Sequence, residues 1–230
     1  MRTIANTFVW PRLRPFYPRL RGREFRLLDV GCGNHSPTRT KKYFPHVQYF
    51  GIDVTNYNND EADLRAMDAF YQLDLENSSL SEVPDEYFDV ILIAHVLEHL
   101  RNGLDVLAKL AGSKLKVGGQ IYVEFPAVRS LSLPSMEGTL NFCDDNTHVR
   151  LYDIKEVANT LLAAGCKVQR AGTRRCWDRA LLAPLGYAYL RYVRKTKRTG
   201  GLFWDLLGFA EFVLAERKTV ESRKSIPFQI

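Results

Sequence analysis

The chain has 230 residues, of which 46% are hydrophobic and 25% are charged, and its net charge is +6. These values are typical of a globular protein with one large domain and exclude a disordered or fibrous chain. No apolar run approaches the roughly 18 residues that a membrane-spanning helix requires, and prolines and arginines interrupt any signal-peptide core near the start. Four scattered cysteines without a C-x-x-C motif argue against a zinc site and favour free thiols, so we expect a cytoplasmic protein.

The positive charge is concentrated in two segments. Residues 1–26 contain seven arginines and one glutamate, and residues 174–200 contain eight basic residues and one aspartate. The segment between them, 27–173, is acidic, with 20 carboxylates and 13 basic residues. We therefore expect an acidic domain that carries two basic attachments.

Residues 1–25 are rich in arginine, proline and aromatic residues. The prolines, and the residues that precede them, disfavour a regular helix, so we predict an extended N-terminal arm. Arginines interleaved with aromatic residues are typical of segments that bind nucleic acid or anionic lipid headgroups. A partly ordered leader is an equally good interpretation.

A buried strand over residues 27–30 ends in a glycine turn. Its apolar run does not alternate, which is typical of a parallel strand covered on both faces. Gly31 and Gly33 permit positive φ and a close approach of a ligand to the backbone. Cap-type residues at 34–37 then predict a helix through 39–44. A strand, a tight turn and a helix N-terminus make a nucleotide-type site at the carboxyl edge of an α/β sheet.

The turn differs from a dinucleotide site. In G-x-G-x-x-G the third glycine packs the helix against the strand, but Ser36 holds that position, and Asp29 stands two residues before Gly31. The order Asp29–Gly33 resembles the first motif of class I S-adenosylmethionine (SAM)-dependent methyltransferases. An acid beside the turn suits SAM, which has a sulfonium and an ammonium in place of a pyrophosphate. By itself the motif is also compatible with an ordinary glycine turn.

Two further predicted strands end near carboxylates. The strand over 47–53 ends at Asp53, 22 residues after Gly31, which is the spacing at which a carboxylate reaches ribose hydroxyls. The strand over 70–75 carries Asp74 near its end. The resemblance implies that this acid binds the adenine amino group. The alternatives are a solvated turn acid for Asp53 and a capping acid for Asp74.

The most hydrophobic predicted strand, over 87–94, belongs at the centre of the sheet. The stretch F-D-V-I-L-I-A-H-V-L-E-H-L over 88–100 is closely similar to the "type 11" group of small class I methyltransferases. Together with the earlier motifs, the resemblance covers about residues 25–170. It implies an α/β fold with a seven-stranded Rossmann-like sheet of order 3-2-1-4-5-7-6, an antiparallel strand 7, and SAM as cofactor.

The resemblance also implies which residues bind the cofactor. These residues are Asp29, Gly31, Cys32, Gly33, Asp53, Asp74, Leu75 and His95. His35 departs from the family pattern, because many relatives have the third glycine of G-x-G-x-G there. We expect its side chain to crowd or contact the methionine end of SAM.

His95 follows the central strand, and we expect it to point into the site. Glu98 and His99 lie three and four residues further on, so the three side chains share one face of a turn. That arrangement could hold a metal ion, and a related Glu/Glu/His cluster occurs at this place in ubiquinone-pathway O-methyltransferases. Because only three ligands are visible, we favour a site without a metal.

The segment 127–150 is a long predicted loop, and loops of this length are usually functional or mobile. It ends in an H-x-R-x-Y segment, which borders the acceptor pocket in similar methyltransferases. His148, together with Asp144 or Asp145, could form an oriented general base. A surface histidine in a polar loop is the alternative.

The segment 174–206 is an insertion between the last two predicted strands, 166–172 and 209–216. It contains a predicted helix over 179–195, bent near Pro184. An apolar stripe at helical spacing favours packing against the core or as a lid. Its members are Leu181, Leu182, Leu185, Tyr189 and Val193. The basic end favours an anionic acceptor or a peripheral membrane contact through 174–200. It consists of Arg191, Arg194, Lys195, Lys197 and Arg198.

We therefore predict a methyltransferase domain over 26–216, followed by a tail over 217–230. It would transfer a methyl group from SAM to an oxygen or nitrogen of a small, anionic, glycan- or lipid-linked acceptor. A hydroxyl acceptor requires a base, for which His148 and His95 are the candidates. An RNA methyltransferase is an alternative, although the missing N-P-P-Y or D-P-P-Y motif disfavours methylation of base amino groups. A non-catalytic SAM-binding module is the second alternative.

Overall fold

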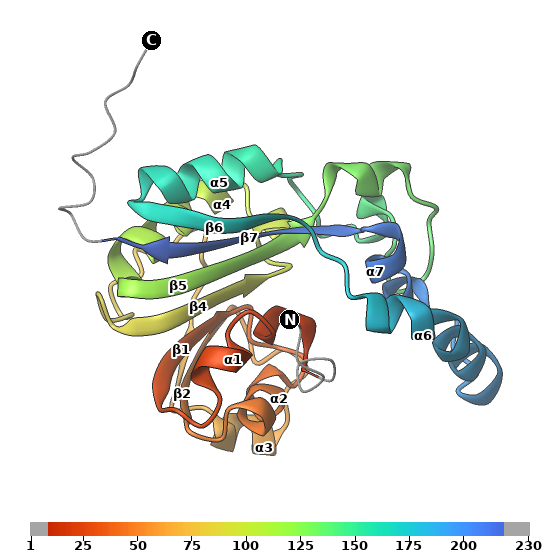
Figure 1. Ribbon diagram of the computed structural model, residues 1–230, viewed down its shortest axis with the longest axis horizontal. Helices are drawn as coiled ribbons and strands as arrows, with labels where there is room; N and C mark the ends of the chain where they lie inside the picture. The colour runs from red at the N-terminus through yellow and green to blue at the C-terminus, as the bar shows by residue number, and fades with distance from the viewer. Residues whose placement is uncertain (1–8, 219–230) are drawn as a thin grey trace, which may run out of the picture.

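The structure, a computed structural model, describes residues 9–218, and their strands form one seven-stranded sheet (Figure 1). The order is β3-β2-β1-β4-β5-β7-β6, and β7 runs antiparallel to both of its neighbours. The other neighbouring strands are parallel. These findings confirm the predicted fold class, strand order and direction of strand 7. The strands are β1 (Phe25–Val30), β2 (Val47–Asp53), β3 (Ala69–Gln72), β4 (Phe88–Ala94), β5 (Leu115–Pro126), β6 (Cys166–Thr173) and β7 (Ala210–Arg217).

Helices lie on both faces of the sheet. Helices α4 and α5 cover one face, α1, α2 and α3 lie on the other, and α6 and α7 extend beyond one end of the sheet (Figure 1). The α-helices are α1 (Tyr17–Leu20), α2 (Ser36–Tyr43), α3 (Glu61–Ala66), α4 (Gly103–Lys109), α5 (Ile154–Ala163), α6 (Trp177–Ala188) and α7 (Trp204–Leu207). Short 3-10 helices cover Pro11–Leu13, Leu97–His99, Val128–Ser132, Phe142–Asp144 and Gly200–Leu202, and π-helical turns cover Leu110–Lys114 and Tyr189–Val193.

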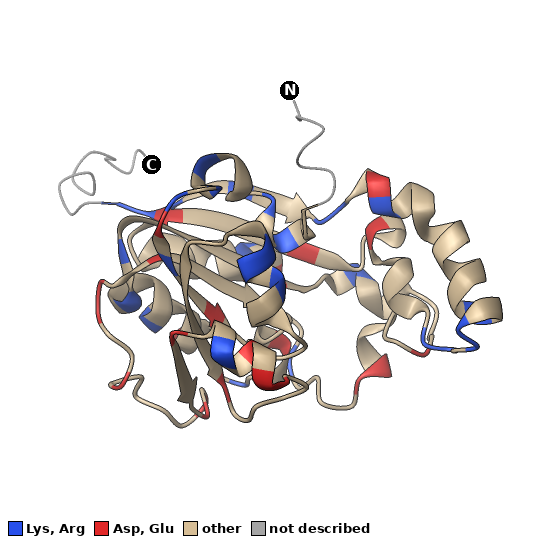
Figure 2. Cartoon of the chain, turned by 90° about the horizontal axis from the view of Figure 1, so that it is seen from below, with Lys and Arg blue, Asp and Glu red and all other residues tan. Residues whose placement is uncertain are grey.

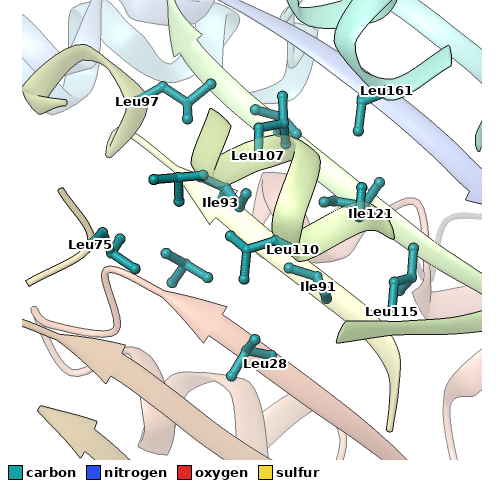
Figure 3. Packing of buried hydrophobic residues seen from close by; sticks show 14 of the residues in the cluster. Leu28, Leu75, Ile91, Ile93, Leu97, Leu107, Leu110, Leu115, Ile121 and Leu161 are labelled. Carbon is teal, nitrogen blue, oxygen red and sulfur yellow. The ribbon is translucent and has the colours of Figure 1, made fainter. Parts of the chain in front are cut away.

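The central strand β4 is buried on both faces, which explains its continuous apolar run. Ile91 and Ile93 pack against Leu107 and Leu110 on the α4 side (Figure 3). Val90 and Leu92, which alternate with these isoleucines along β4, belong to a second hydrophobic cluster on the opposite face of the sheet. Because successive side chains of a strand point to opposite faces, a strand covered on both sides needs apolar residues at every position.

The N-terminal segment is not the extended arm that we predicted. Its described part forms the 3-10 helix at Pro11–Leu13 and the short helix α1, and it packs against the sheet. Phe16 is buried with its ring edge against Tyr122 of β5. The prolines do not prevent these turns, because Pro11 and Pro18 both stand in a first turn, where the missing N–H is tolerated. The segment is therefore part of the core.

The insertion also differs from prediction. Helix α6 continues through Pro184, and the irregularity comes later, in the π-helical turn at Tyr189–Val193. The predicted packing of its apolar stripe against the core is wrong, because the stripe is exposed to solvent. The residues of α6 that are buried are the small ones, Ala180 and Ala183.

The remaining differences are local. Residues 117–119 lie inside the long strand β5, near the point where its pairing with β4 shifts register. Strand β3 ends at Gln72, earlier than predicted, so Asp74 lies just beyond it. Most of the predicted tail lies outside the described residues. Within 9–218, the helices are too short or too polar to cross a membrane.

Candidate active site

The glycine turn after β1 is shaped by two close approaches. Gly31 has φ of +75°, and a Cβ at this position would lie 2.4 Å from Cγ2 of Val96. A Cβ at Gly33 would lie 2.7 Å from the backbone oxygen of Tyr57. Both distances are too short for a side chain, so the turn requires glycine at both positions.

A cavity of about 820 Å³ opens above this turn, at the carboxyl ends of β1, β2 and β4. Cavities of this size hold small-molecule ligands and cofactors. Six of the eight predicted cofactor-binding residues line it. They are Gly31, Gly33, Asp53, Asp74, Leu75 and His95.

Asp29, one of the other two, lies beneath the turn and has 0% exposure. Its Oδ2 atom accepts hydrogen bonds from the hydroxyl of Tyr49 (2.6 Å), from the Ser36 hydroxyl and from the Arg12 guanidinium (3.3 Å). The predicted direct contact with the cofactor is not supported by this geometry. Asp29 instead ties the turn to α2, β2 and the N-terminal segment, and so positions the turn.

Cys32 is also buried and does not line the cavity. A Cβ at Gly51 of β2 would lie 2.5 Å from its sulfur, so the side chain fills the space that this glycine leaves. Burial, together with the charge of Asp29, raises the pKa of the thiol. Cys32 therefore contributes packing under the turn.

The two predicted carboxylates reach the cavity from neighbouring strands. Asp53 is half-buried at the end of β2, and burial raises its pKa. It accepts a hydrogen bond from the N–H of Val54 at 2.8 Å. Asp74 is exposed and caps a turn by accepting from the N–H of Glu76 (3.0 Å) and the Asn77 amide (2.7 Å). Asp74 thus caps a turn, which was one of the two interpretations, and it also lines the cavity, where binding of the adenine stays a prediction.

His35 turns away from the cavity. Its backbone is left-handed (φ +58°), and its Nδ1 atom lies 2.6 Å from Oδ2 of Asp63 in α3. The side chain is absent from the cavity wall, so the geometry does not support the expected contact with the methionine end of SAM.

His95 lies between two carboxylates. Its Nδ1 atom is 3.1 Å from Oε1 of Glu98, and its Nε2 atom is 3.1 Å from Oε1 of Glu124. Burial lowers the pKa of His95, but the two carboxylates outweigh burial and raise it to about 9. At neutral pH the ring is therefore protonated on both nitrogens and has no lone pair. This geometry does not fit the general base that the sequence suggested.

A buried charge network extends from this histidine to the insertion. Glu124 of β5 also accepts from the hydroxyl of Tyr122 at 2.5 Å and lies 3.0 Å from Nε of Arg174. Arg174 in turn binds Asp205 of α7 at 2.7 Å. Burial raises the pKa of Glu124, but Arg174 and His95 lower it overall to about 2. The network fastens the insertion to the sheet at the cavity wall.

His148 is not part of the cavity wall. Its side chain is 5% exposed, and its Nδ1 atom lies 2.7 Å from the carbonyl oxygen of Phe142. Asp145 is 4.0 Å from its Nε2 atom. Asp144 does not face it, because it accepts from backbone N–H groups of its own loop.

The imidazole at the cavity wall, besides His95, is His99, whose ring centroid lies 4.9 Å from that of His148. Its Nδ1 atom is 3.0 Å from Oγ1 and 3.2 Å from the carbonyl oxygen of Thr147. If Nδ1 donates to this carbonyl, Nε2 keeps its lone pair. The sequence assigned His99 only to a metal site, and its position next to the cavity depends on the 127–150 loop.

Three candidate metal ligands that lie together in the structure are not the three that the sequence predicted. Glu98, His99 and His148 offer ligand atoms within 4.8 Å of one another. His95 does not join them, because both of its nitrogens face carboxylates. The Oε2 atom of Glu98 is buried and has no hydrogen-bond partner among the described residues.

Several cavity residues were not singled out by the sequence. Trp10 and Arg12 come from the N-terminal segment, and the guanidinium carbon of Arg12 lies 3.8 Å from the centre of the Trp10 ring. Trp204 and Arg179 come from the insertion. The arginine- and aromatic-rich composition of residues 1–25 and the basic charge of the insertion were the only signals for these residues.

Comparisons with known proteins agree with this geometry. A family model described as a methyltransferase domain matches residues 6–171. The chain is 29% identical over 136 residues to 27-O-demethylrifamycin SV methyltransferase of Amycolatopsis mediterranei (strain S699). The match covers 54% of this chain and 48% of the relative, so the chain spans about half the length of that curated relative.

Two solved structures share the fold. An S-adenosylmethionine-dependent methyltransferase from Mesorhizobium loti has a TM-score of 0.60 at 16% identity, over 90% of this chain and 97% of its own. A phosphoethanolamine N-methyltransferase 2 from Haemonchus contortus has a TM-score of 0.60 at 16% identity, over 94% of this chain and 52% of its own.

Proposed function

The chain belongs to the methyltransferase domain family and has the class I fold, and we propose that it methylates an oxygen or nitrogen atom of a small acceptor with SAM as donor. The observation that carries the proposal is one cavity lined by the glycine turn, Asp53 and Asp74 at the carboxyl edge of the sheet. Three separate strands deliver these groups, which an ordinary glycine turn would not require.

The residues present fit SAM. Asp53 pairs with no lysine or arginine in the described part of the chain, and burial raises its pKa although hydrogen-bond donors from the backbone of Val54, Thr55 and Gly33 lower it. Two ribose hydroxyls would supply such donors. Asp74 and Leu75 would hold the adenine, and the backbone of Gly31 and Gly33 would face the methionine end. When bound, SAM supplies a methyl group already activated on a sulfonium.

The protein contributes mainly positioning and the exclusion of water. Trp10 and Trp204 close the cavity from two segments far apart in the sequence. The protonated His95 keeps Glu98 and Glu124 paired and so holds the wall of the cavity in place. The side chain available for accepting a proton from an acceptor hydroxyl is His99, through its Nε2 atom.

We favour an oxygen acceptor with anionic character. His99 at the wall supports removal of a hydroxyl proton, and the name of the Amycolatopsis relative indicates methylation of an O-demethylated compound. Arg179 lines the cavity with a side chain that is 45% exposed and would attract a negatively charged acceptor, whereas Arg12 and Arg174 are buried against carboxylates. A glycan- or lipid-linked acceptor is compatible with these features.

The test is methyl transfer from radiolabelled SAM into a protein-free extract of metabolites and lipids, with products identified by mass spectrometry. The wild type is compared with His99→Gln and with His46→Gln, a matched control because His46 is exposed and lies outside the cavity. We expect His99→Gln to lower kcat by about 100-fold without changing the affinity for S-adenosylhomocysteine.

A chelator distinguishes the base from a metal site. If His99 acts as the base, the rate is unchanged by EDTA. A rate that is lost with EDTA and restored by a divalent cation would assign Glu98, His99 and His148 to a metal instead. Binding of S-adenosylhomocysteine without transfer to any component of the extract would contradict the enzymatic proposal and favour a binding module.

A further inference from the structure

Helix α6 and the π-helical turn that follows it project from the domain (Figure 1). They expose large apolar side chains. Six such side chains lie between residues 181 and 193, with exposed fractions from 51% to 78%. They are Leu181, Leu182, Leu185, Tyr189, Tyr192 and Val193. Sixteen large hydrophobic residues are exposed in the described chain, so more than a third of them gather in these thirteen positions.

These side chains share one face. At 100° per residue, the six positions fall within an arc of about 120° on a helix. Ala180 and Ala183, which are buried, lie outside this arc. The helix therefore contacts the domain through Ala180, Ala183 and Tyr187, whose ring centre lies 6.0 Å from that of Phe203, and turns the six large residues outward. A surface helix of a globular protein shows the reverse arrangement.

The far end of this helix is strongly basic. Between Arg179 and Asp205 the chain contains no acidic residue. Figure 2 shows basic residues gathered at the outer end of the projecting helix and in the loop beyond it. None of the five basic residues there forms an ion pair with another side chain of residues 9–218. They are Arg191, Arg194, Lys195, Lys197 and Arg198.

We infer that this helix docks in the plane of an anionic phospholipid surface. A helix with an apolar face, aromatic residues and basic side chains lies at the boundary between headgroups and acyl chains. Tyr189 and Tyr192 suit that boundary, because one end of a tyrosine ring is polar and the other apolar. The five cations attract anionic headgroups. A second copy of the chain is a poorer occupant, because it would bring two such basic clusters together.

The start of the helix is fastened to the cavity wall. Asp205 binds the guanidinium of Arg174 at 2.7 Å and the N–H of Cys176 at 3.0 Å, so it holds the start of α6. Arg174 and Trp204, at the two ends of the insertion, both line the cavity. A docked helix would therefore hold the acceptor side of the cavity next to the lipid surface. Membrane binding itself does not depend on the proposed methyl transfer.

The test is co-sedimentation of the full chain with vesicles. Vesicles of phosphatidylcholine with phosphatidylglycerol are compared with vesicles of phosphatidylcholine alone, at low and high salt. We expect the protein to bind the anionic vesicles and to dissociate at high salt. The apolar variant is Leu181→Ser/Leu185→Ser, and its control is Leu162→Ser, an exposed leucine of α5.

The basic variant is Lys195→Gln/Arg198→Gln, with Lys109→Gln/Lys155→Gln as a control of equal charge at exposed sites elsewhere. Loss of two basic residues is expected to lower partitioning by roughly 30-fold, and loss of the two leucines by at least roughly tenfold. The controls are expected to bind like the wild type.

Three results would overturn the inference. The first is a wild type that stays in the supernatant with anionic vesicles, and the second is variants that bind as well as their controls. The third is a wild type that does not bind but dimerises in sedimentation velocity, with the leucine variant monomeric, which would assign the face to a second copy. Affinity for S-adenosylhomocysteine should be unchanged in every variant, which separates this test from that of the proposed function.

Discussion

The Nε2 atom of His95 lies 3.1 Å from Oε1 of Glu124, and this contact joins the carboxyl end of β4 to β5 at the cavity wall. Glu98 holds the other ring nitrogen, and Arg174 helps to keep Glu124 ionised. His95 also has a left-handed backbone (φ +57°), which turns its side chain toward these partners. The histidine is therefore a fixed positive charge in a buried network.

Stability should depend on pH through His95. Its pKa is 6.5 in the unfolded chain and about 9 in the folded protein, which corresponds to roughly 3 kcal/mol. A raised pKa stabilises the folded state fully below pH 6.5, and this contribution is lost as the pH rises through about 9. We expect the difference in unfolding free energy between wild type and His95→Gln to shrink over this interval in urea titrations. A difference that does not vary with pH would contradict the ion pairs.

The glycine turn should be intolerant of a side chain for a reason beyond its positive φ. Gly31→Ala is compared with Gly118→Ala, because Gly118 has a similar φ (+79°) but no atom within 4 Å of a built Cβ. Gly118→Ala should lower the unfolding free energy by about 1 kcal/mol. Gly31→Ala should lower it by a further 1–3 kcal/mol or so, because its Cβ meets Val96. Equal losses in the two variants would show that the contact with Val96 is relaxed without strain.

The two basic attachments of the sequence meet at one ion pair. Arg14 of the N-terminal segment makes two contacts with Asp178 of α6, at 2.9 and 2.6 Å. A double-mutant cycle of Arg14→Met and Asp178→Asn should give a coupling energy of about 1 kcal/mol, since the pair is partly buried and two-pronged. A coupling energy near zero would mean that the segment and the helix are held together by other contacts.

The reactivity of the four cysteine thiols should follow their burial. Cys143 is exposed, whereas the other three are buried. Burial raises the pKa of Cys176 to about 11 and that of Cys32 further. We expect one thiol to react rapidly with Ellman's reagent in the native protein and three more after denaturation. Cys143→Ser should abolish the rapid phase, and a rapid phase that survives this change would contradict the burial of the others.

The sheet and the glycine turn could be predicted because their signals are local. The strands over 27–30 and 87–94 have continuous apolar runs, which only strands covered on both faces require. Asp53 follows its strand at a fixed spacing from Gly31, so one motif located the other. These signals can be read from the sequence without knowing any contact between residues that are distant along the chain.

The side-chain roles at the site could not be read in the same way. His95 and His99 lie four residues apart, and the sequence offered no reason to separate a paired imidazolium from a cavity-wall imidazole. Their roles are decided by Glu124 of the next strand and by the 127–150 loop, which are distant in sequence. Asp29 was likewise taken for a ligand contact, because its partners Tyr49 and Arg12 come from separate elements.

The N-terminal segment was misread because its prolines were taken as helix breakers throughout. Proline disfavours the interior of a helix, but it is favoured in the first turn. Leu13 and Phe16 are buried against the sheet, and this tertiary packing stabilises turns too short to persist alone.

We expect the cavity to hold SAM through the carboxylate of Asp53. Titration calorimetry with S-adenosylhomocysteine tests it on the wild type, Asp53→Ala and Glu82→Ala, where Glu82 is an exposed acid outside the cavity. We expect the wild type and Glu82→Ala to bind equally, and Asp53→Ala to bind roughly 10- to 100-fold more weakly, because hydrogen bonds to a charged group are lost. A wild type that does not bind, or an Asp53→Ala variant that binds as tightly, would contradict this role of Asp53.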